Sequence, residues 1–292
     1  MTLKLLVVHK KSARSADTPR WDALLSSKKV QPAWVRQDQR RQRQALKAHA
    51  KTLEHVQQVL KSLGLSCELA YRSSRLDETP FDGVISVGGD GTFLEAARGV
   101  KPHQWILGVN SDPKRSVGSF CAATRATFKK ILTHFLDGEG GVLKLERLVV
   151  EMNGARLNVQ VLNDLLITHK TPAAMSRYWL AVGRVKEDQR SSGLWIATAA
   201  GSTGAIRSAG GRLLPRISAR VQYRPREPYR GHRSDYRLTG GAVLLKEQPI
   251  QVGSLMQDGL ICVDGDHLTF PFEYGDLLAV KRSPYPLQVV VK

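Results

Sequence analysis

The apolar residues of the first 110 positions fall into short clusters and one longer helical stretch. Three short apolar runs, at residues 3–8, 83–87 and 105–109, are typical of buried strands, and the alternation of Leu65, Cys67 and Leu69 suggests one more strand. Between the first two runs, six apolar residues recur every three or four positions, which predicts an amphipathic helix that ends at Gly64. These residues are Leu46, Ala50, Leu53, Val56, Leu60 and Leu63. Strands and helices at this spacing predict an α/β domain with an open, mostly parallel sheet.

The pattern changes near residue 138, where Gly138, Gly140 and Gly141 follow one another closely. From there to residue 272, many short β-like segments are separated by glycine-rich or polar turns, which is typical of an antiparallel, all-β domain. The last apolar runs, 277–280 and 287–291, again resemble buried strands. The sequence therefore predicts an α/β domain followed by an all-β domain.

The chain is strongly basic, with a formal net charge of +18 and an isoelectric point near 10.1. Such a charge attracts polyanions, so it fits a nucleic-acid binder, an enzyme with anionic nucleotide substrates, or a solvated basic surface. A basic cluster within residues 36–47 opens the predicted helix, and we interpret it as a solvated helix face rather than a phosphate contact. Its members are Arg36, Arg40, Arg41, Arg43 and Lys47.

Cysteine, histidine and apolar patterns argue against several classes of protein. Cys67, Cys121 and Cys262 form no CxxC pair, and the eight histidines show no HExxH spacing, so we expect no zinc site and no disulfide framework. Magnesium brought in with a substrate is compatible with the sequence. No run of about 18 uncharged apolar residues occurs, and the first residues lack the layout of a secretory signal. We therefore expect a cytoplasmic protein that does not span a membrane.

Residues 88–92 read Gly-Gly-Asp-Gly-Thr and lie between a predicted strand and a predicted helix. Ligands bind at the carboxyl ends of strands in such sheets, and glycine N–H groups beside a helix N-terminus approach phosphate closely. A carboxylate is a poor neighbour for phosphate, so we interpret Asp90 as a general base for an attacking hydroxyl, worth ~10²–10⁴-fold in rate. Magnesium held by a triphosphate would offset the negative charge. The alternative is a tight turn in which Asp90 caps the following helix.

Two further segments combine polar and small residues. Asn163 and Asp164 interrupt an apolar stretch and must be paired if they are buried. Together they could grip ribose hydroxyls or a carboxamide; a β-bulge or turn is the alternative. Residues 197–211 are mostly small, which permits close approach of a flat ligand, although a flexible loop would look alike. The candidate hydrogen-bonding hydroxyls of this segment are those of Ser202, Thr203 and Ser208.

Together these segments resemble the ATP-NAD kinase family, whose signature strings occur here in the family's order. They are GGDGT at 88–92, an Asn-Asp pair at 163–164, and a Gly-Ser-Thr loop that runs into Ser-Ala-Gly-Gly at 201–211. Asp264-Gly265 resembles the family's late Asp-Gly pair. Residues 110–118, together with 226–228, resemble the mitochondrial-type branch of the family.

The resemblance implies an NAD kinase-like fold, with an α/β domain at 1–137 rejoined by 273–292 and a β domain with NAD-binding loops at 138–272. It implies that Asp90 activates the 2′-hydroxyl of the adenosine ribose of NAD. Donor phosphates would be held by Gly88, Gly89, Gly91 and Thr92. NAD would be contacted by Gly89, Asp90 and Gly91, by Asn163 and Asp164 on its nicotinamide side, and by Thr203, Gly204 and Ser208 around adenine and ribose.

The resemblance also implies substrates, a cofactor and an assembly. ATP or another polyphosphate would be the donor, magnesium or another divalent cation would arrive with it, and the protein would be a homodimer or homotetramer. Nucleic acid is not expected as a partner despite the basic charge. The chain departs from the family loop at Ala200, which lacks a hydroxyl, and at Ala205, which lacks an aromatic ring. Loss of an aromatic stack costs about 1 kcal/mol or more of ligand contact.

Two other hypotheses stay open at this point. The first is a lipid or sugar kinase, because diacylglycerol, sphingosine and phosphofructo-kinases share a related Gly-Gly-Asp-Gly loop. The second is a nonenzymatic nucleic-acid or nucleotide binder, which would leave Asp90 without a role. The chain has neither GxxxxGK[ST] nor GxGxxG, so it is neither a P-loop enzyme nor a standard dinucleotide-binding fold. The sequence does not distinguish ATP from polyphosphate, NAD from NADH, or a dimer from a tetramer.

Overall fold

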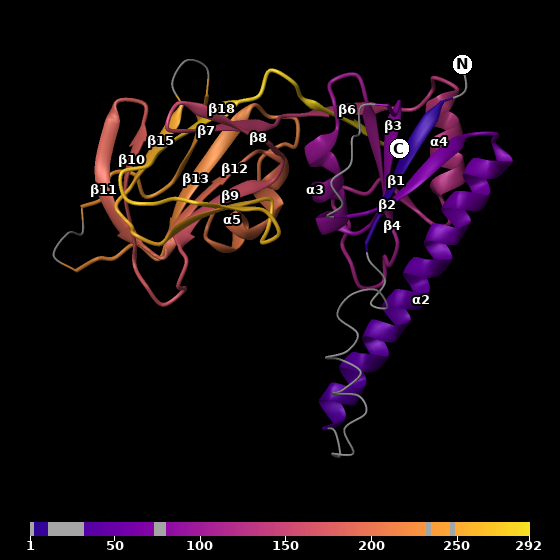
Figure 1. Ribbon diagram of the computed structural model, residues 1–292, viewed down its shortest axis with the longest axis horizontal. Helices are drawn as coiled ribbons and strands as arrows, with labels where there is room; N and C mark the ends of the chain where they lie inside the picture. The colour runs from indigo at the N-terminus through magenta and orange to yellow at the C-terminus, as the bar shows by residue number, and fades with distance from the viewer. Residues whose placement is uncertain (1–2, 11–31, 73–79, 232–234, 246–248) are drawn as a thin grey trace. The chain divides into compact units, whose positions relative to one another are not determined.

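Figure 1 shows the computed structural model of the chain, which describes residues 3–10, 32–72, 80–231, 235–245 and 249–292. The chain folds as two units. Unit 1 comprises Met1–Val142 and Gln288–Lys292, and unit 2 comprises Leu143–Leu287. Unit 1 combines helices with strands, and unit 2 is built mainly of strands, so the two predicted fold classes are confirmed.

Unit 1 is built on a seven-stranded sheet. Its strands are β1 (Lys4–His9), β2 (Ser66–Tyr71), β3 (Gly83–Gly88), β4 (Trp105–Asn110), β5 (Ala123–Thr124), β6 (Val142–Leu145) and β19 (Leu287–Val290). They lie in the order β2-β1-β3-β4-β19-β6, with β5 beside β4. The pairs β1–β2, β1–β3, β3–β4, β4–β5 and β4–β19 are parallel, as expected. All of β3 is buried, including Ser86, which explains why its sequence is almost entirely apolar.

The described part of unit 1 contains the helices α2 (Ala33–Ser62), α3 (Asp90–Gly99) and α4 (Phe128–Leu136). The predicted long helix is α2, and Gly64 after it has φ +67°, a left-handed conformation that glycine adopts without strain. Its buried face differs from the predicted stripe, because Ala50 is exposed whereas His49 and Thr52 are buried. Two polar side chains therefore lie on the inner face of α2.

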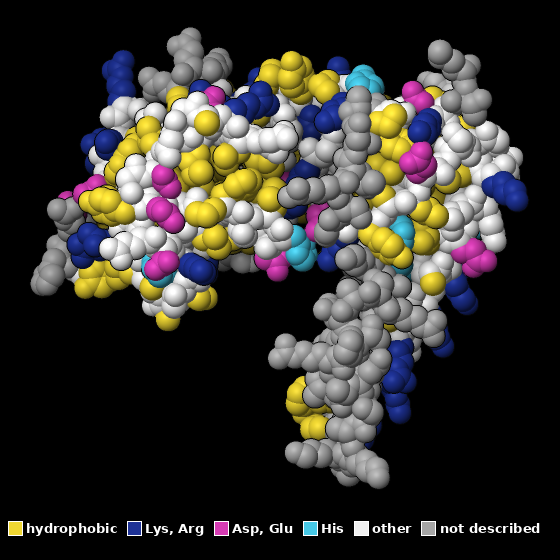
Figure 2. Space-filling view, viewed as in Figure 1, with side chains coloured by type: hydrophobic (Ala, Val, Ile, Leu, Met, Phe, Trp, Pro, Cys, Tyr) yellow, Lys and Arg dark blue, Asp and Glu magenta, His cyan; other side chains and the backbone are white. Residues whose placement is uncertain are grey.

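The surface of α2 carries the basic cluster of residues 36–47. All five of its Lys and Arg residues are exposed, and dark blue side chains lie along this helix in Figure 2. This exposure agrees with a solvated helix face. Among the described residues, no helix is long and apolar enough to span a membrane.

The described part of unit 2 contains two six-stranded sheets. The first runs, in spatial order, β11 (Val185–Ser191), β10 (Ser176–Val182), β15 (Ile250–Ser254), β18 (Leu277–Arg282), β7 (Leu148–Met152) and β8 (Ala155–Val161). The second runs β14 (Gly241–Leu244), β13 (Arg220–Arg226), β12 (Gly193–Ala197), β9 (Asp164–His169), β16 (Gly259–Val263) and β17 (Thr269–Pro271). Neighbouring strands are antiparallel. Buried side chains of both sheets, such as Tyr178 and Ile196, form one hydrophobic cluster, so the sheets pack together through their apolar faces.

The division between the units falls at other residues than expected. Unit 1 extends to Val142, the first residue of β6, rather than to residue 137. The chain returns to unit 1 at Gln288 rather than residue 273. The reason is that β18 pairs with β15 and β7 in the first sheet of unit 2, so that only β19 pairs with a strand of unit 1.

The carboxyl ends of the parallel strands meet at one edge of the unit 1 sheet. His9 of β1 pairs in register with Val87, and Gly88 of β3 pairs with Asn110 of β4. The turn at 88–92 therefore lies at this edge, where open α/β sheets bind their ligands. The helix after it, α3, begins at Asp90 itself rather than near Thr92.

Candidate active site

The three glycines of the 88–92 turn meet different surroundings. A Cβ added at Gly88 would collide with the side chain of Thr92, and one at Gly89 would lie 2.7 Å from Ser116 Oγ. Gly88 is therefore needed for the close packing of Thr92, whereas at Gly89 only the Ser116 hydroxyl would have to move. A Cβ at Gly91 would have Arg72 Nη1 as its nearest neighbour at 3.7 Å, which is ordinary contact. The fold itself thus leaves Gly91 free to carry a side chain.

Thr92 lies beneath this turn. Its relative exposure is only 2%, and its backbone N–H donates to the carbonyl of Gly89 at 3.1 Å. Its side chain packs where a Cβ of Gly88 would stand. The structure thus places Thr92 as a support of the turn, whereas the sequence suggested a contact to donor phosphate.

Asp90 is half-buried at the first position of α3. Its Oδ1 accepts the backbone N–H of Phe120 at 2.8 Å, and its Oδ2 accepts that of Ser119 at 3.0 Å. The residue preceding the helix is Gly89, and α3 has no side-chain cap, so Asp90 does not cap its own helix. An ionised carboxylate offers about four acceptor positions, so Asp90 can accept further hydrogen bonds from a ligand.

Residues 119 and 120 are themselves held in place by packing. The ring of Phe120 stacks on that of Phe93 in α3, with ring centroids 5.3 Å apart. Phe120 is buried, and the chain at Gly108 passes so close that a Cβ there would be 2.8 Å from the Phe120 carbonyl oxygen. The N–H group of Phe120 that bonds to the Asp90 carboxylate is therefore held in place by packing.

The loop after β4 closes around Asn110. Its Nδ2 donates to the carbonyl of Ser116 at 2.9 Å, and its Oδ1 accepts the N–H of Asp112 at 3.1 Å. Gly118 has φ +63°, and a Cβ there would collide with the Asn110 side chain. Asp112 is buried and forms an ion pair with Arg115 at 2.9 Å. This loop is the stretch that resembles the mitochondrial-type branch, and it lies at the same sheet edge as the 88–92 turn.

Basic side chains gather at the ends of β1 and β2. The rings of His9 and His49 stack with centroids 6.0 Å apart. Burial, followed by the positive charges of Lys10 and His9, lowers the pKa of His49 to about 4, and burial also lowers the pKa of Lys10. These residues and Arg72, whose guanidinium lies beside Gly91, were missed by the sequence analysis. The available signal was that Lys10 and Arg72 directly follow predicted strands, now β1 and β2, at an edge where positive charge favours phosphate.

In unit 2, Leu162 and Asn163 form the bend between β8 and β9, and Asp164 is the first residue of β9. Asp264 holds this bend by accepting the N–H groups of Leu162 at 3.1 Å, Asn163 at 2.7 Å and Asp164 at 3.1 Å. Asn163 Nδ2 donates to Asp164 Oδ2 at 2.8 Å. The backbone here is a bend, and the two side chains hydrogen-bond to each other, which satisfies part of their need for partners in a largely buried place.

Asp164 and Asp264 are both buried, with relative exposures of 4% and 6%. Burial, followed by the negative charge of Asp264, raises the pKa of Asp164 to about 7. At neutral pH, Asp164 is therefore close to its titration point and can both donate and accept hydrogen bonds. Asp264 has φ +50°, a conformation uncommon outside glycine. Its anchoring role could not be read from the sequence, where only the Asp-Gly pair drew attention.

The small-residue segment packs against this bend. It forms the short helices η1 (Ala200–Thr203) and α5 (Ala205–Ser208). A Cβ at Gly201 would collide with the carbonyl oxygen of Asn163, and one at Gly204 would lie 3.0 Å from Asn163 Nδ2. The structure therefore brings Asn163, Asp164 and Gly204 together, because only glycine allows the two segments to approach this closely.

The hydroxyls of this segment divide into two kinds. Ser202 is fully buried and its Oγ accepts the N–H of Leu214 at 3.0 Å, so the expectation that it faces a ligand is wrong. Thr203 and Ser208 are exposed. A cavity of about 470 Å³ lies beside α5 and includes Ser208. It is lined by Trp195, Ala205, Ser208, Ala209, Arg226 and Glu227.

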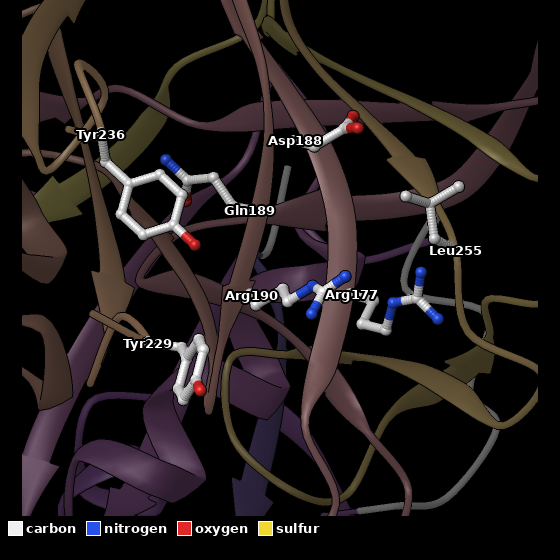
Figure 3. A pocket seen from close by; sticks show the side chains of 7 residues that line it. All are labelled: Arg177, Asp188, Gln189, Arg190, Tyr229, Tyr236 and Leu255. Atoms are coloured by element: carbon white, nitrogen blue, oxygen red, sulfur yellow. The ribbon is translucent and has the colours of Figure 1, made fainter. Parts of the chain in front are cut away.

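A second cavity of unit 2, of about 340 Å³, is shown in Figure 3. Arg177 of β10 and Arg190 of β11 stand directly opposite each other in the strand register, and Tyr229 and Tyr236 line the cavity with them. Two facing guanidinium groups attract anions. None of the site residues expected from the sequence lines this cavity. The two arginines meet through the register of β10 and β11, which no local sequence pattern shows.

The expected site residues thus form two groups. Residues 88–92 lie together in unit 1, and Asn163, Asp164, Thr203, Gly204 and Ser208 belong to unit 2. Among the described residues, no group of three or more His, Cys, Asp or Glu side chains is arranged to hold a metal ion.

Comparison with known proteins agrees with these features. The family model described as the ATP-NAD kinase N-terminal domain matches residues 6–140. A "Probable NADH kinase" of Oryza sativa subsp. japonica is 38% identical over 231 residues, which cover 72% of this chain and 71% of the relative. The "NAD kinase 2, mitochondrial" of Homo sapiens is 37% identical over 118 residues, covering 38% of this chain and 26% of that protein.

Solved structures show the same fold. The crystal structure of an NAD kinase from Archaeoglobus fulgidus in complex with ATP matches with a TM-score of 0.69 and 23% identity, covering 98% of this chain and 93% of the other. Yeast NADH kinase complexed with NADH matches with a TM-score of 0.67 and 14% identity, covering 100% and 84%. Because the rice relative is matched over more than two thirds of its length, the chain belongs to the ATP-NAD kinase family of enzymes.

Proposed function

We propose that this protein transfers a phosphoryl group from ATP or another polyphosphate to the 2′-hydroxyl of the adenosine ribose of NAD, giving NADP. The observation that carries the proposal is the Asp90 carboxylate, which two backbone N–H groups fix at the start of α3. The names of the relatives support the substrate class, because they include both NAD kinases and NADH kinases. NADH is therefore kept as a second acceptor.

In the proposed reaction, Asp90 accepts the proton of the ribose 2′-hydroxyl as its oxygen attacks the terminal phosphorus. The new P–O bond forms, the bond to the leaving polyphosphate breaks, and the proton stays on the carboxylate until it returns to solvent. A positioned base of this kind contributes ~10²–10⁴-fold to the rate. The rigid anchoring of Asp90 supports this role, because a base must lie within hydrogen-bond reach of the hydroxyl.

The donor phosphates are proposed to bind at the N-terminus of α3. The backbone N–H groups of Gly89 and Gly91 and the positive end of the helix dipole suit an anion there. Lys10 and Arg72 add positive charge at the same sheet edge. Magnesium usually keeps several waters and binds through substrate phosphates, so a divalent cation would come with the donor and neutralise its charge.

The acceptor is proposed to bind to unit 2. Asn163 and Asp164 would hold the nicotinamide-side ribose and amide, since their polar atoms converge on the bend that Asp264 fixes. Thr203, Gly204 and Ser208 would line the pocket for adenine and its ribose. The protein is further proposed to act in the cytoplasm as a homodimer or homotetramer.

The test is a coupled assay of the purified protein with Mg·ATP or polyphosphate and with NAD or NADH, read out by an NADP-specific dehydrogenase. Asp90→Asn is expected to lower kcat by about 10²–10⁴-fold with little change in the KM for NAD. Asp82→Asn is the matched control, because Asp82 is also a carboxylate of unit 1 that accepts a backbone N–H, from Lys4 at 2.7 Å. Turnover by Asp90→Asn within tenfold of the wild type would remove Asp90 from the role of base.

A further inference from the structure

Trp195 stands on the face of the second sheet of unit 2 that points away from the core. Its neighbours along β12, Leu194 and Ile196, are fully buried in the hydrophobic cluster. Side chains alternate along a strand, so the half-buried indole of Trp195 lies on the opposite face. In register it pairs with Leu166 of β9 and Arg224 of β13.

The helix α5 packs against this face of the sheet. The Nε of Arg224 donates to the carbonyl of Ala209 at 2.9 Å, which ties the end of α5 to the sheet. The cavity of about 470 Å³ opens between them, and the indole of Trp195 forms part of its lining. The α5 side contributes Ala205 and Ala209, whose small side chains leave the space above the indole unfilled.

The remaining lining side chains are polar and of both charges. Arg226 is two residues from Arg224 along β13, and therefore projects from the same face as Trp195. Glu227 follows it with a backbone φ of +41°, a left-handed conformation that is rare for residues other than glycine. An aromatic face, a guanidinium, a carboxylate and the Ser208 hydroxyl together suit a flat heteroaromatic ring that bears hydrogen-bonding edges and a phosphate.

We propose that Trp195 stacks on the adenine ring of the NAD acceptor and supplies the aromatic surface that Ala205 lacks. The inference rests on the proposed function and assigns its specificity-determining residue. Arg226 then faces the phosphate of the same nucleotide, and the Glu227 carboxylate accepts a hydrogen bond from the adenine amino group. Adenine fits this lining because its amino group can donate to the Glu227 carboxylate and its ring nitrogens can accept from the Ser208 hydroxyl.

The first experiment compares Trp195→Ala, Trp195→Phe and the control Trp179→Ala in the NAD kinase assay. Trp179 is a half-buried indole of the same unit, with Lys186 Nζ 3.9 Å from its ring, and it does not line the cavity. Base–aromatic stacking predicts that Trp195→Ala raises the KM for NAD about 5- to 150-fold while kcat changes little. Trp195→Phe is expected to stay within about threefold of the wild type, as is Trp179→Ala, because stacking needs only an aromatic face at residue 195.

A rescue separates stacking from a structural role. In the Trp195→Ala background, Ala205→Tyr places an aromatic ring on the other wall of the same cavity and is expected to recover a large part of the lost affinity. If Trp195 had only a structural role, an aromatic ring at position 205 would not restore the KM for NAD. An unchanged KM for Trp195→Ala, in an enzyme that is active on NAD, would overturn the inference and leave the proposed function intact.

The second experiment identifies the ring, using adenosine 5′-monophosphate and nicotinamide mononucleotide as probes. The emission of Trp195 is the difference in fluorescence between the wild type and Trp195→Phe. We expect adenosine 5′-monophosphate to quench this emission and nicotinamide mononucleotide to leave it unchanged. Quenching by nicotinamide mononucleotide alone would overturn the assignment of adenine. Quenching by adenosine 5′-monophosphate in a protein without NAD kinase activity would instead refute the proposed function and retain the nucleotide pocket.

Discussion

Replacement of Asp264 by Asn is expected to lower the free energy of unfolding of unit 2 by about 2–4 kcal/mol. The buried carboxylate accepts three backbone N–H groups, those of Leu162, Asn163 and Asp164. Asn is the cleanest substitution because it has nearly the same shape and tolerates the left-handed φ of +50° at this position. The backbone at residue 264 is therefore not what the substitution perturbs.

The magnitude follows from the hydrogen bonds. The single side-chain oxygen of Asn can keep the N–H groups of Asn163 and Asp164, both of which bond to Oδ1 of Asp264. The N–H of Leu162, which bonds to Oδ2, then faces an NH₂ group and loses its acceptor. A buried, unpartnered N–H costs about 1–3 kcal/mol, and two neutral bonds replace two charge-assisted ones at about 1 kcal/mol each. Relief of the repulsion between Asp264 and Asp164 offsets part of this loss.

The assay is denaturant unfolding followed by tryptophan fluorescence, together with the KM for NAD. Asp266→Asn is the matched control, because the Asp266 side chain is 90% exposed and its contact with His267 is a surface pair of small energy. We expect Asp266→Asn to stay within about 0.5 kcal/mol of the wild type. A loss of less than about 1 kcal/mol for Asp264→Asn, or an unchanged KM, would refute the reasoning that Asp264 holds the bend.

Two further predictions concern protonation and close packing. Because burial and Asp264 raise the pKa of Asp164 to about 7, its contribution to stability is complete below pH about 4 and is lost as the pH rises to about 7. Asp164→Asn should therefore flatten the fall in unfolding free energy over this range by up to about 4 kcal/mol; identical pH profiles would contradict the assignment. Gly201→Ala should destabilise unit 2 by about 1–3 kcal/mol, since its Cβ meets the Asn163 carbonyl. Gly91→Ala should leave thermal stability unchanged, because its Cβ has room in the protein. The same variant should reduce activity with ATP, because the added methyl group would stand where the donor phosphate is proposed to bind. Equal losses of melting temperature for both glycine variants would argue against this contrast.

Local patterns foretold much of the fold. The short β-rich run at 83–87 reflects a strand buried on both faces, and the 88–92 turn lies at its carboxyl end, as expected. The helix that ends at Gly64 was also visible, because helical periodicity and a left-handed glycine are short-range features. The prediction of which α2 residues are buried was less exact. Ala50 is exposed whereas His49 is buried, since neighbouring strands, not the helix itself, decide which polar side chains are covered.

By itself, the sequence determined the elements with short-range signals, the order of the family motifs, and the candidate site residues. The tertiary structure alone decided which of them meet. Asp264 reaches a bend about one hundred residues earlier, Trp195 rather than residue 205 offers an aromatic face beside α5, and β18 stays in unit 2. The physical reason is that these contacts depend on strand order and register, which are set by the packing of whole sheets and leave no mark in any short stretch of sequence.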